Sequence, residues 1–316
     1  MMRKLSRAAV VAVVMAAGLS LVGCGQVNQL KAKQAFKDAN GLYGGQDYKK
    51  AAAKYEETLQ LDPDLNEAYF FLGNSYDNLY KPSRKGEAEN DAYLTKAIDN
   101  YRKAADKAPD PKIQKLALEY LVAAYGPDKM NDPTQAEPMV LKMIALDPKD
   151  AANYFALAKI YEDGGNYEQA EATLLKAKEQ RPNDPAVYMQ LAGYYNRQGE
   201  FDKTIQSLQE RAQQEPNNPE AFYTIATYYW DKAYRDFRLS DADKKGFVQQ
   251  GVQAVDKALQ LKSDYMEALV YKNLLLRLEA NLEKDPKRQQ ALLKEADQLR
   301  DKAQEMRKQK AQGTGE

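Results

Sequence analysis

This sequence has few of the side chain types that take part in nucleophilic, acid–base or metal chemistry. Among its 316 residues there is one cysteine, Cys24, and there is no histidine. A disulfide within the chain is therefore impossible, and zinc sites built from cysteine and histidine are excluded. Histidine acid–base catalysis and the nucleophile pairs that depend on histidine are excluded for the same reason. What is left to consider is the chemistry of the Cys24 thiol and that of the carboxylates.

Carboxylate pairs remain a route to catalysis, because two acids at a set separation can cleave glycosidic bonds. The acidic residues here are scattered, and charged residues form 29% of the chain, so such pairs arise by chance. No glycine-rich phosphate loop or metal-ligand cluster accompanies them. We therefore expect no enzyme activity, no metal and no cofactor. A glycan-acting hydrolase that uses carboxylates is kept as an alternative.

Cys24 ends a segment with the pattern of a secretion signal. Arg3, Lys4 and Arg7 give it a basic start, and residues 8–22 are almost entirely apolar. Fifteen helical residues span about 22 Å, which is short of the ~30 Å hydrocarbon core of a bilayer. The pattern therefore predicts a cleaved signal peptide at residues 1–23 and not a permanent membrane span.

The residues that lead up to the cysteine, Leu21-Val22-Gly23-Cys24, resemble the lipobox of bacterial lipoproteins. In that family the thiol takes a diacylglyceryl group, and the cysteine becomes the first residue of the mature chain. The resemblance implies lipidation of Cys24, followed by a short tether over residues 24–31. Gly25, in place of Asp, at the second mature position implies an outer-membrane location facing the periplasm. An inert, buried cysteine is the alternative.

Charge and hydropathy exclude two further classes. Lys+Arg and Asp+Glu both number 46, and the mean hydropathy is −0.73. Without residues 1–23 the chain keeps 43 basic against 46 acidic residues, a net charge of about −3. We therefore expect no nucleic-acid partner, and the chain is too polar to be a multi-span membrane protein.

Prolines recur along the rest of the chain at regular steps. Pro63, Pro148, Pro182 and Pro216 each follow an expected helix, which proline cannot continue. The last three are separated by 34 residues each, and no convincing strand pattern lies between them. The spacing predicts an all-α protein made of helix pairs with a period of 34 residues.

The period and the residues within it resemble the tetratricopeptide repeat. In residues 151–184 the family's places hold Tyr154, Leu157, Ala158, Tyr161, Gly165, Tyr167, Ala170, Ala177 and Pro182. The resemblance implies a right-handed superhelical solenoid of about six to seven helix-turn-helix repeats over residues 32–284. Insertions are expected near residues 81–92 and 231–250. The second should lengthen two helices, with Ser240 or Asp241 as the cap.

The last expected helix, residues 285–310, carries an apolar stripe at alternating steps of four and three. Its members are Leu292, Ala296, Leu299, Ala303 and Met306. Because the stripe is under three heptads long, we expect a helix that caps the open end of the solenoid. A structural homo-oligomer formed through this helix is the alternative. Residues 311–316 are expected to be a disordered tail.

Tetratricopeptide proteins bind peptides in a concave groove that is lined by the first helix of each pair. Carried onto this chain, the groove places are Phe70, Asn74, Phe155, Lys159, Met189, Asn196, Arg197, Tyr223, Thr227 and Trp230. Large apolar residues at Phe70, Phe155, Met189 and Tyr223 are more than a solvated helix face needs, which favours a ligand groove. The family's carboxylate clamp for acidic C-termini is absent, since Phe70 replaces its lysine and Lys159 its asparagine.

Together these patterns predict a lipid-anchored adaptor of the bacterial cell envelope. We expect it to bind a protein or peptide in its groove, to catalyse nothing, and to carry only the covalent lipid. It resembles the tetratricopeptide lipoproteins that assist the assembly of envelope complexes. The alternatives are an envelope glycan hydrolase and a structural homo-oligomer.

Overall fold

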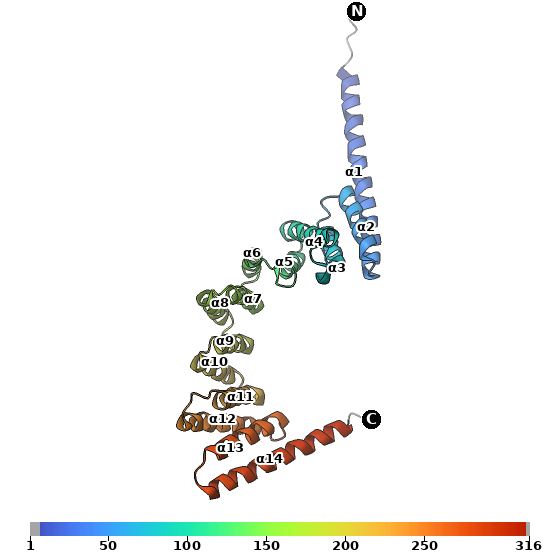
Figure 1. Ribbon diagram of the computed structural model, residues 1–316. Helices are drawn as coiled ribbons and strands as arrows, with labels where there is room; N and C mark the ends of the chain where they lie inside the picture. The colour runs from blue at the N-terminus through green and yellow to red at the C-terminus, as the bar shows by residue number, and fades with distance from the viewer. Residues whose placement is uncertain (1–6, 314–316) are drawn as a thin grey trace, which may run out of the picture. The chain divides into compact units, whose positions relative to one another are not determined.

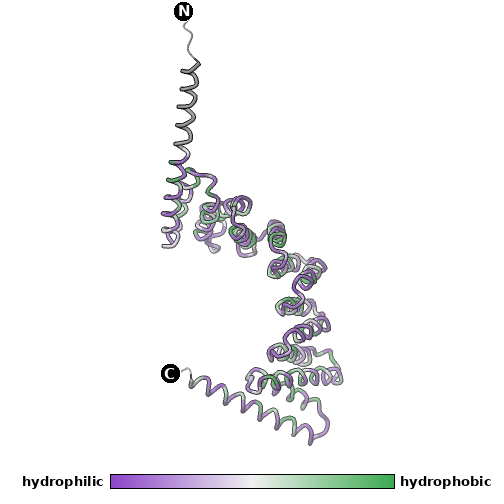
Figure 2. Tube along the Cα trace, turned by 180° about the vertical axis from the view of Figure 1, so that it is seen from behind, coloured by the Kyte–Doolittle hydropathy of each residue, from purple (hydrophilic) through white to green (hydrophobic). Residues whose placement is uncertain are grey.

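The computed structural model describes the backbone of residues 7–313 and the side chains of residues 25–311. Within this range all regular structure is helical, with fourteen α-helices, one short 3₁₀ helix and no strand, as the sequence predicts. The chain divides into two units, Met1–Ala170 and Glu171–Glu316, and each is described by itself. Along the helices hydrophobic and hydrophilic positions alternate (Figure 2), so each helix has one face to bury.

The first unit is built from helices that pack in the order of the chain (Figure 1). They are α1 (Arg7–Gly44), α2 (Tyr48–Leu61), α3 (Glu67–Leu79), α4 (Ala88–Lys107), α5 (Pro111–Tyr125), α6 (Pro133–Leu146) and α7 (Ala151–Asp163). The 3₁₀ helix η1 (Pro82–Arg84) lies between α3 and α4, and α8 (Tyr167–Gln180) crosses the division between the units.

Helix α1 runs without a break through residues 24–31, where the sequence suggested a tether. The side chains of residues 1–24, Cys24 among them, lie outside the described residues. The signal peptide and the lipidation of Cys24 therefore stay predictions. Among the described residues, no helix combines the length and the apolar character needed to cross a membrane.

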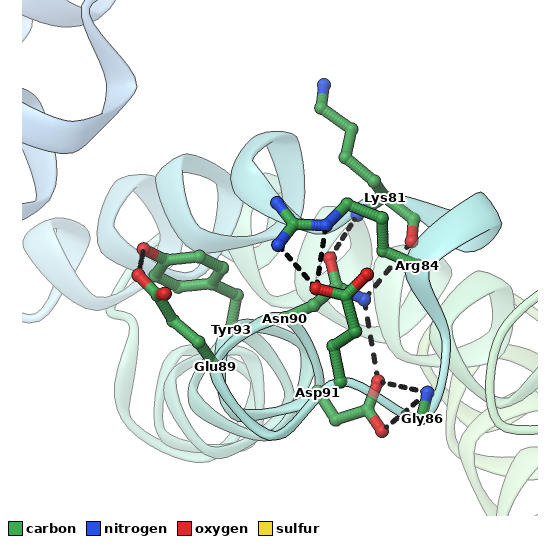
Figure 3. A network of polar contacts seen from close by, with 8 residues as sticks. Lys81, Arg84, Gly86, Glu89, Asn90, Asp91 and Tyr93 are labelled. Atoms are coloured by element: carbon green, nitrogen blue, oxygen red, sulfur yellow. Dashed lines mark hydrogen bonds and ion pairs between the residues drawn. The ribbon is translucent and has the colours of Figure 1, made fainter.

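The first insertion forms an ordered loop, which the side chain of Asn90 closes (Figure 3). The Asn90 amide accepts a hydrogen bond from the Lys81 N–H, at 2.8 Å, and donates one to the Lys81 carbonyl, at 3.1 Å. Asn90 is only 2% exposed, so these bonds are shielded from water. Gly86 turns the chain inside the loop with a φ of 97°, which favours glycine, and its N–H donates to Asp91 at 3.0 Å.

The second unit continues the same pattern (Figure 1). Its helices are α9 (Pro185–Arg197), α10 (Phe201–Gln214), α11 (Pro219–Arg235), α12 (Asp241–Leu261), α13 (Met266–Leu282) and α14 (Pro286–Gly313). Successive helices pack on one another, and α11 also contacts α13. The first helices of its three pairs are thus α9, α11 and α13.

These helices begin at N-capping residues that the sequence supplies locally. The side chains of Asp184 and Asn218 each accept a hydrogen bond from the backbone N–H two residues further on. The residue that follows each of them is a proline, which is the first residue of α9 and of α11, respectively. Proline fits there because the first N–H of a helix has no partner inside it. Ser240 caps the lengthened α12, as expected, by accepting from the Asp243 N–H.

The turns between pairs are held by tyrosines of the repeat. Pro148 and Pro182 stand in the turns after α6 and α8, as their spacing predicts. Tyr154 donates its hydroxyl hydrogen bond to the Pro148 carbonyl at 3.0 Å, and Tyr188 donates to the Pro182 carbonyl at 2.5 Å. Both rings are buried, so the same residue fills the core and fixes the turn.

Helix α14 packs along α13 through its apolar stripe. Ala296 is 0% exposed, Ala303 is also buried, and the larger members of the stripe are half-buried. Lys272 of α13 joins the neighbouring helices through ion pairs to Asp256 of α12, at 2.9 Å, and to Glu295 of α14, at 3.0 Å. Helix α14 thus completes the last pair by covering the face of α13 on which it packs.

Candidate functional site

Three of the expected groove residues line one pocket of the second unit. Asn196 comes from α9, and Thr227 and Trp230 come from α11. The pocket has a volume of about 270 Å³ and is completed by Tyr228, Asp231, Arg235 and Tyr271. All of these residues lie on α9, α11 or α13, the first helices of successive pairs. We call this site the α9–α11–α13 pocket.

A smaller hollow continues from the α9–α11–α13 pocket. It has a volume of about 110 Å³ and shares Asn196, Tyr228 and Asp231 with the larger one. Its far side is formed by Phe201 and Lys232. The site is therefore elongated, with Asn196 between its two parts.

Five rings form a continuous row along α11 and α13, and we call them the aromatic row: Tyr234, Trp230, Tyr271, Tyr223 and Tyr265. Trp230 stacks on Tyr234 with 4.9 Å between ring centroids and meets Tyr271 edge to face at 5.6 Å. Tyr223 meets Tyr271 edge to face at 5.4 Å and lies 5.2 Å from Tyr265. These contacts fix the orientation of the rings before any ligand arrives.

The polar side chains of the pocket carry little net charge. Asp231 and Arg235 form an ion pair at 2.7 Å, one helical turn apart and both exposed. Such a pair adds little to stability, but it neutralises the only charged groups that line the pocket. The Asn196 amide is exposed, and the Thr227 hydroxyl donates to the Thr224 carbonyl at 2.7 Å.

Burial affects the tyrosine next to the pocket. Desolvation first, and then the neighbouring rings of Tyr271 and Tyr265, raise the pKa of Tyr223 to about 12. The phenol therefore stays protonated, and stays a hydrogen-bond donor, far above neutral pH.

The chemistry available in the pocket is binding chemistry. Its lining contains a single carboxylate, that of Asp231, which is ion-paired, whereas glycoside hydrolysis uses two. Within the described part of the chain, no group of three or more Cys, Asp or Glu side chains is placed to hold a metal ion. What the pocket does offer is ring surface, amide and hydroxyl groups, and an elongated shape.

Two expected groove residues of the first unit lie in its core, which corrects the sequence-based prediction. Phe70 is buried, with its ring 5.5 Å from that of Tyr120, which α5 contributes. Asn74 is also buried and accepts a hydrogen bond from the Tyr43 hydroxyl of α1, at 2.6 Å. Neighbouring helices thus supply aromatic residues that cover both positions, so neither is open to a ligand.

Comparisons with known proteins agree with this arrangement of helix pairs. A tetratricopeptide repeat family model matches residues 129–192, and the model of the plant-specific mitochondrial import receptor subunit TOM20 matches residues 43–143. The solved C-terminal part of a TPR repeat-containing protein from Cytophaga hutchinsonii is 16% identical, with a TM-score of 0.54. The match covers 86% of this chain and 98% of that one.

The chain folds as a tetratricopeptide repeat solenoid. The fold class expected from the 34-residue period is thereby confirmed.

Two further solved structures match with lower TM-scores. A tetratricopeptide repeat protein from Parabacteroides merdae is 13% identical, covers 84% of this chain and 98% of its own, and has a TM-score of 0.44. PilW, described as a type IV pilus biogenesis factor, is 19% identical, covers 75% and 96%, and has a TM-score of 0.40. No curated protein sequence matches the chain.

The other expected tetratricopeptide groove residues lie outside the α9–α11–α13 pocket. Phe155, half-buried, and Lys159, exposed, are on α7 in the first unit. Met189 of α9 is half-buried, and its sulfur accepts a hydrogen bond from Arg211 at 3.0 Å. Arg197 is exposed at the end of α9, and Tyr223 joins the site only through the aromatic row.

Four pocket residues were not expected from the sequence: Tyr228, Asp231, Arg235 and Tyr271. Tyr228 and Asp231 lie next to the predicted groove places Thr227 and Trp230, and Arg235 belongs to the extra turn of α11, which has 17 residues where α9 has 13. Tyr271 belongs to the last pair, where the family's residues are too weak to set the register. The signal available was the density of aromatic residues in 222–234 and 265–271.

A separate cavity of about 510 Å³ lies between α10, α11 and α12. Phe222, Ile225 and Tyr229 form its floor, and these residues occupy the face of α11 opposite to the α9–α11–α13 pocket. Its edge carries the glutamine side chains Gln209, Gln213, Gln250 and Gln253. This cavity faces the second helices of the tetratricopeptide pairs and plays no part in the groove.

Proposed function

We propose that this protein is a binding scaffold that holds an extended segment of a partner protein in the α9–α11–α13 pocket. The observation that carries the proposal is the convergence of Asn196, Trp230 and Tyr271 from three successive first helices on one pocket. The helices of a solenoid stack rigidly on their neighbours, so a site shared by three of them is preorganised for its ligand.

The residues of the pocket suit the groups of an extended peptide. A peptide in this conformation keeps its backbone N–H and C=O groups free, and the exposed Asn196 amide can donate to one and accept from another. The rings of Trp230 and Tyr271 offer apolar surface for its side chains. The smaller hollow beyond Asn196 extends the site along the direction in which such a peptide continues.

The proposal includes attachment to a membrane in the bacterial cell envelope. It is supported by the residues Leu21-Val22-Gly23-Cys24, which follow a basic start and an apolar run. Two or three acyl chains on Cys24, at about 0.8 kcal/mol per buried CH₂, would hold the chain on a bilayer. Its role would then be that of an adaptor that keeps a partner at the membrane, with the outer membrane favoured by Gly25.

The binding function can be tested by site-specific photo-crosslinking in cells that make the full chain. A photo-reactive amino acid at position 196 should give discrete adducts, which Trp230→Ala abolishes. The same residue at position 209, on the edge of the separate cavity, should not give these adducts. Phe237→Ala is the matched control, because Phe237 is an aromatic residue that is 88% exposed and outside the pocket. Adducts that persist in Trp230→Ala, or that are lost equally in Phe237→Ala, would contradict the proposal.

The membrane attachment has a test of its own. A Cys24→Ala variant should lose incorporation of labelled fatty acid and should move from the membrane to the soluble fraction after cell lysis. Cys24→Ala protein that stays on the membrane would overturn the lipid anchor and leave the binding pocket untouched.

A further inference from the structure

We propose that one face of α1, directly after Cys24, binds the anionic headgroups of the bilayer to which the lipid attaches the chain. We call this face the headgroup face, and its members are Val27, Leu30, Lys31, Lys33 and Lys37. The inference rests on the proposed membrane attachment and adds a second contact of different chemistry to it. It is carried by two exposed apolar side chains, by three lysines without ion pairs, and by the order of these residues along the helix.

The headgroup face begins with two apolar side chains that no other helix covers. Val27 is 50% exposed and Leu30 is 69% exposed, whereas Ala32, Ala35 and Ala39 are buried where α1 packs in the first pair. At about 100° per residue, Leu30 points about 140–180° away from these three alanines. Figure 1 shows that α2 packs only along the second half of α1. The two side chains are therefore open to a partner outside the first pair.

The charged residues of the headgroup face are all basic. Its three lysines are exposed, and residues 25–37 contain no acid. Within the described part of the chain none of the three forms an ion pair, and the acids that follow α2, Asp62 and Asp64, do not pair with them either. Each lysine close to an anionic bilayer raises the affinity for it about five-fold. The charge of this face thus complements lipid phosphates.

The order of the residues along α1 matches the layers of a bilayer surface. Because α1 is unbroken from Arg7 to Gly44, each residue advances about 1.5 Å along its axis. Val27 therefore lies about 4.5 Å from Cys24 along the axis, and Leu30 lies about 9 Å from it. The headgroup layer is about 5–8 Å thick on each side of a bilayer, and the lipid would hold Cys24 at its inner edge. Val27 then lies within this layer and Leu30 at its outer boundary.

The direction of helical side chains brings the lysines back toward the same layer. Side chains of a helix lean toward its N-terminus, which for the headgroup face means toward Cys24. Lys31 and Lys33 start about 10 Å and about 13 Å from Cys24 along the axis. Their flexible stems can run over apolar surface and place the ammonium groups among the lipid phosphates. Apolar contacts thus come first along the helix and cationic contacts follow, as in the bilayer itself.

The same geometry disfavours a folded protein as the occupant of the headgroup face. A helix is about 10–12 Å across, so a partner helix beside Leu30, only about 9 Å from the lipid-bearing residue, would overlap the headgroup layer. The centres of protein interfaces are in addition depleted in lysine, whereas lysines surround the two apolar side chains here. The bilayer surface is therefore the occupant that both position and charge favour.

A fluorescent thiol probe at position 30 tests the contact in the full lipid-bearing chain. Cys24 is the only cysteine, and the lipid blocks its thiol, so Leu30→Cys provides the one thiol that can be labelled. In vesicles with equal amounts of phosphatidylglycerol and phosphatidylcholine, acrylamide should quench the probe at least about three-fold less than in phosphatidylcholine alone. The affinity of the probe itself for lipid cancels in this comparison. Ala53→Cys, at an exposed position of α2, should be quenched equally in both bilayers. Equal quenching at position 30 overturns the proposal.

A lysine variant of the chain labelled at position 30 isolates the role of charge. Lys33→Gln removes one unpaired cation and should weaken the preference of the probe for the anionic bilayer by up to about five-fold. Lys49→Gln is the matched control, because Lys49 is also exposed but lies on α2, beyond the far end of α1. It should leave the preference unchanged. A Lys33→Gln chain that keeps the full preference, or a Lys49→Gln chain that loses it equally, would exclude the headgroup face as the anionic-lipid contact.

The results also separate this inference from the proposed membrane attachment. If labelled fatty acid is not incorporated at Cys24, the attachment is wrong and the headgroup contact is overturned with it. If the fatty acid is incorporated but position 30 is quenched equally in the two bilayers, the attachment stands and only the headgroup contact is wrong.

Discussion

The Tyr195 hydroxyl donates a hydrogen bond to Oε1 of Glu171, at 2.8 Å, and so ties α9 to the preceding second helix α8. The same relationship recurs one repeat earlier, where Tyr161 donates to Glu137 at 2.7 Å, again across 24 residues. Burial, followed by the hydrogen bond to the carboxylate, raises the pKa of both tyrosines. The repeat thus uses tyrosine at this place for its hydroxyl as well as for its ring.

Tyr195→Phe should lower the free energy of unfolding by about 1–2 kcal/mol, because it removes a hydrogen bond to a charged group. The loss is limited because Glu171 keeps its ion pair with Lys203, at 3.2 Å. Urea unfolding followed by circular dichroism measures the change. Tyr234→Phe is the control, since Tyr234 is 64% exposed, and it should change stability by less than about 0.5 kcal/mol. Equal losses in the two variants would show that the hydroxyl of Tyr195 contributes nothing specific.

The 34-residue period was enough to predict the helix pairs, because proline and capping residues act locally. Pro148 and Pro182 end helices by covalent geometry, and Ser240 caps α12 by a hydrogen bond three residues away. None of these effects depends on contacts between residues distant in the sequence. The residue pattern of a single sequence is therefore sufficient to predict where these helices begin and end.

The lining of the site was only partly predictable, because it depends on contacts between pairs. Phe70 and Asn74 occupy groove places in the repeat, but Tyr120 and Tyr43 cover them from α5 and α1. Tyr271 reaches the pocket from the last pair, whose register the repeat does not set. Which side chain covers a given position is decided by neighbouring helices, and single-repeat spacing carries no information on that.

The pKa of Tyr161 gives stability a defined dependence on pH. Burial and the hydrogen bond to Glu137 raise this pKa to about 12, above the value near 10 of an unfolded tyrosine. The unfolded chain therefore ionises first, so the contribution of Tyr161 is complete below pH ~10 and is lost as the pH rises toward 12. The difference in urea midpoint between the unaltered chain and Tyr161→Phe should shrink between pH 9 and 11.5. A difference that stays constant over this range contradicts the assignment.

Helix α14 should be undocked by a charge in its apolar stripe. Ala296 is 0% exposed against α13, so Ala296→Glu places an unpaired carboxylate in the interface. We expect faster amide exchange along α14 and a loss of about 2–4 kcal/mol in the stability of the last pair. Gln298→Glu, two residues further on and on the exposed side of the helix, should change neither. If Ala296→Glu alters only the sedimentation coefficient and not the stability, the stripe serves another copy of the chain.

Two glycines of α12 should respond to alanine in opposite directions. A Cβ at Gly251 would lie 2.8 Å from Cδ2 of Leu275 and 3.2 Å from Cβ of Tyr229, whereas one at Gly246 would meet nothing within 4 Å. Alanine favours a helix interior over glycine by about 1 kcal/mol, so Gly246→Ala should raise the melting temperature. In Gly251→Ala that gain is outweighed by overpacking of about 1–3 kcal/mol, because the fully buried Leu275 side chain and the Tyr229 Cβ must give way. Thermal unfolding of the two variants measures the contrast. A Gly251→Ala protein as stable as Gly246→Ala would mean that α12 and α13 do not approach as closely as this packing requires.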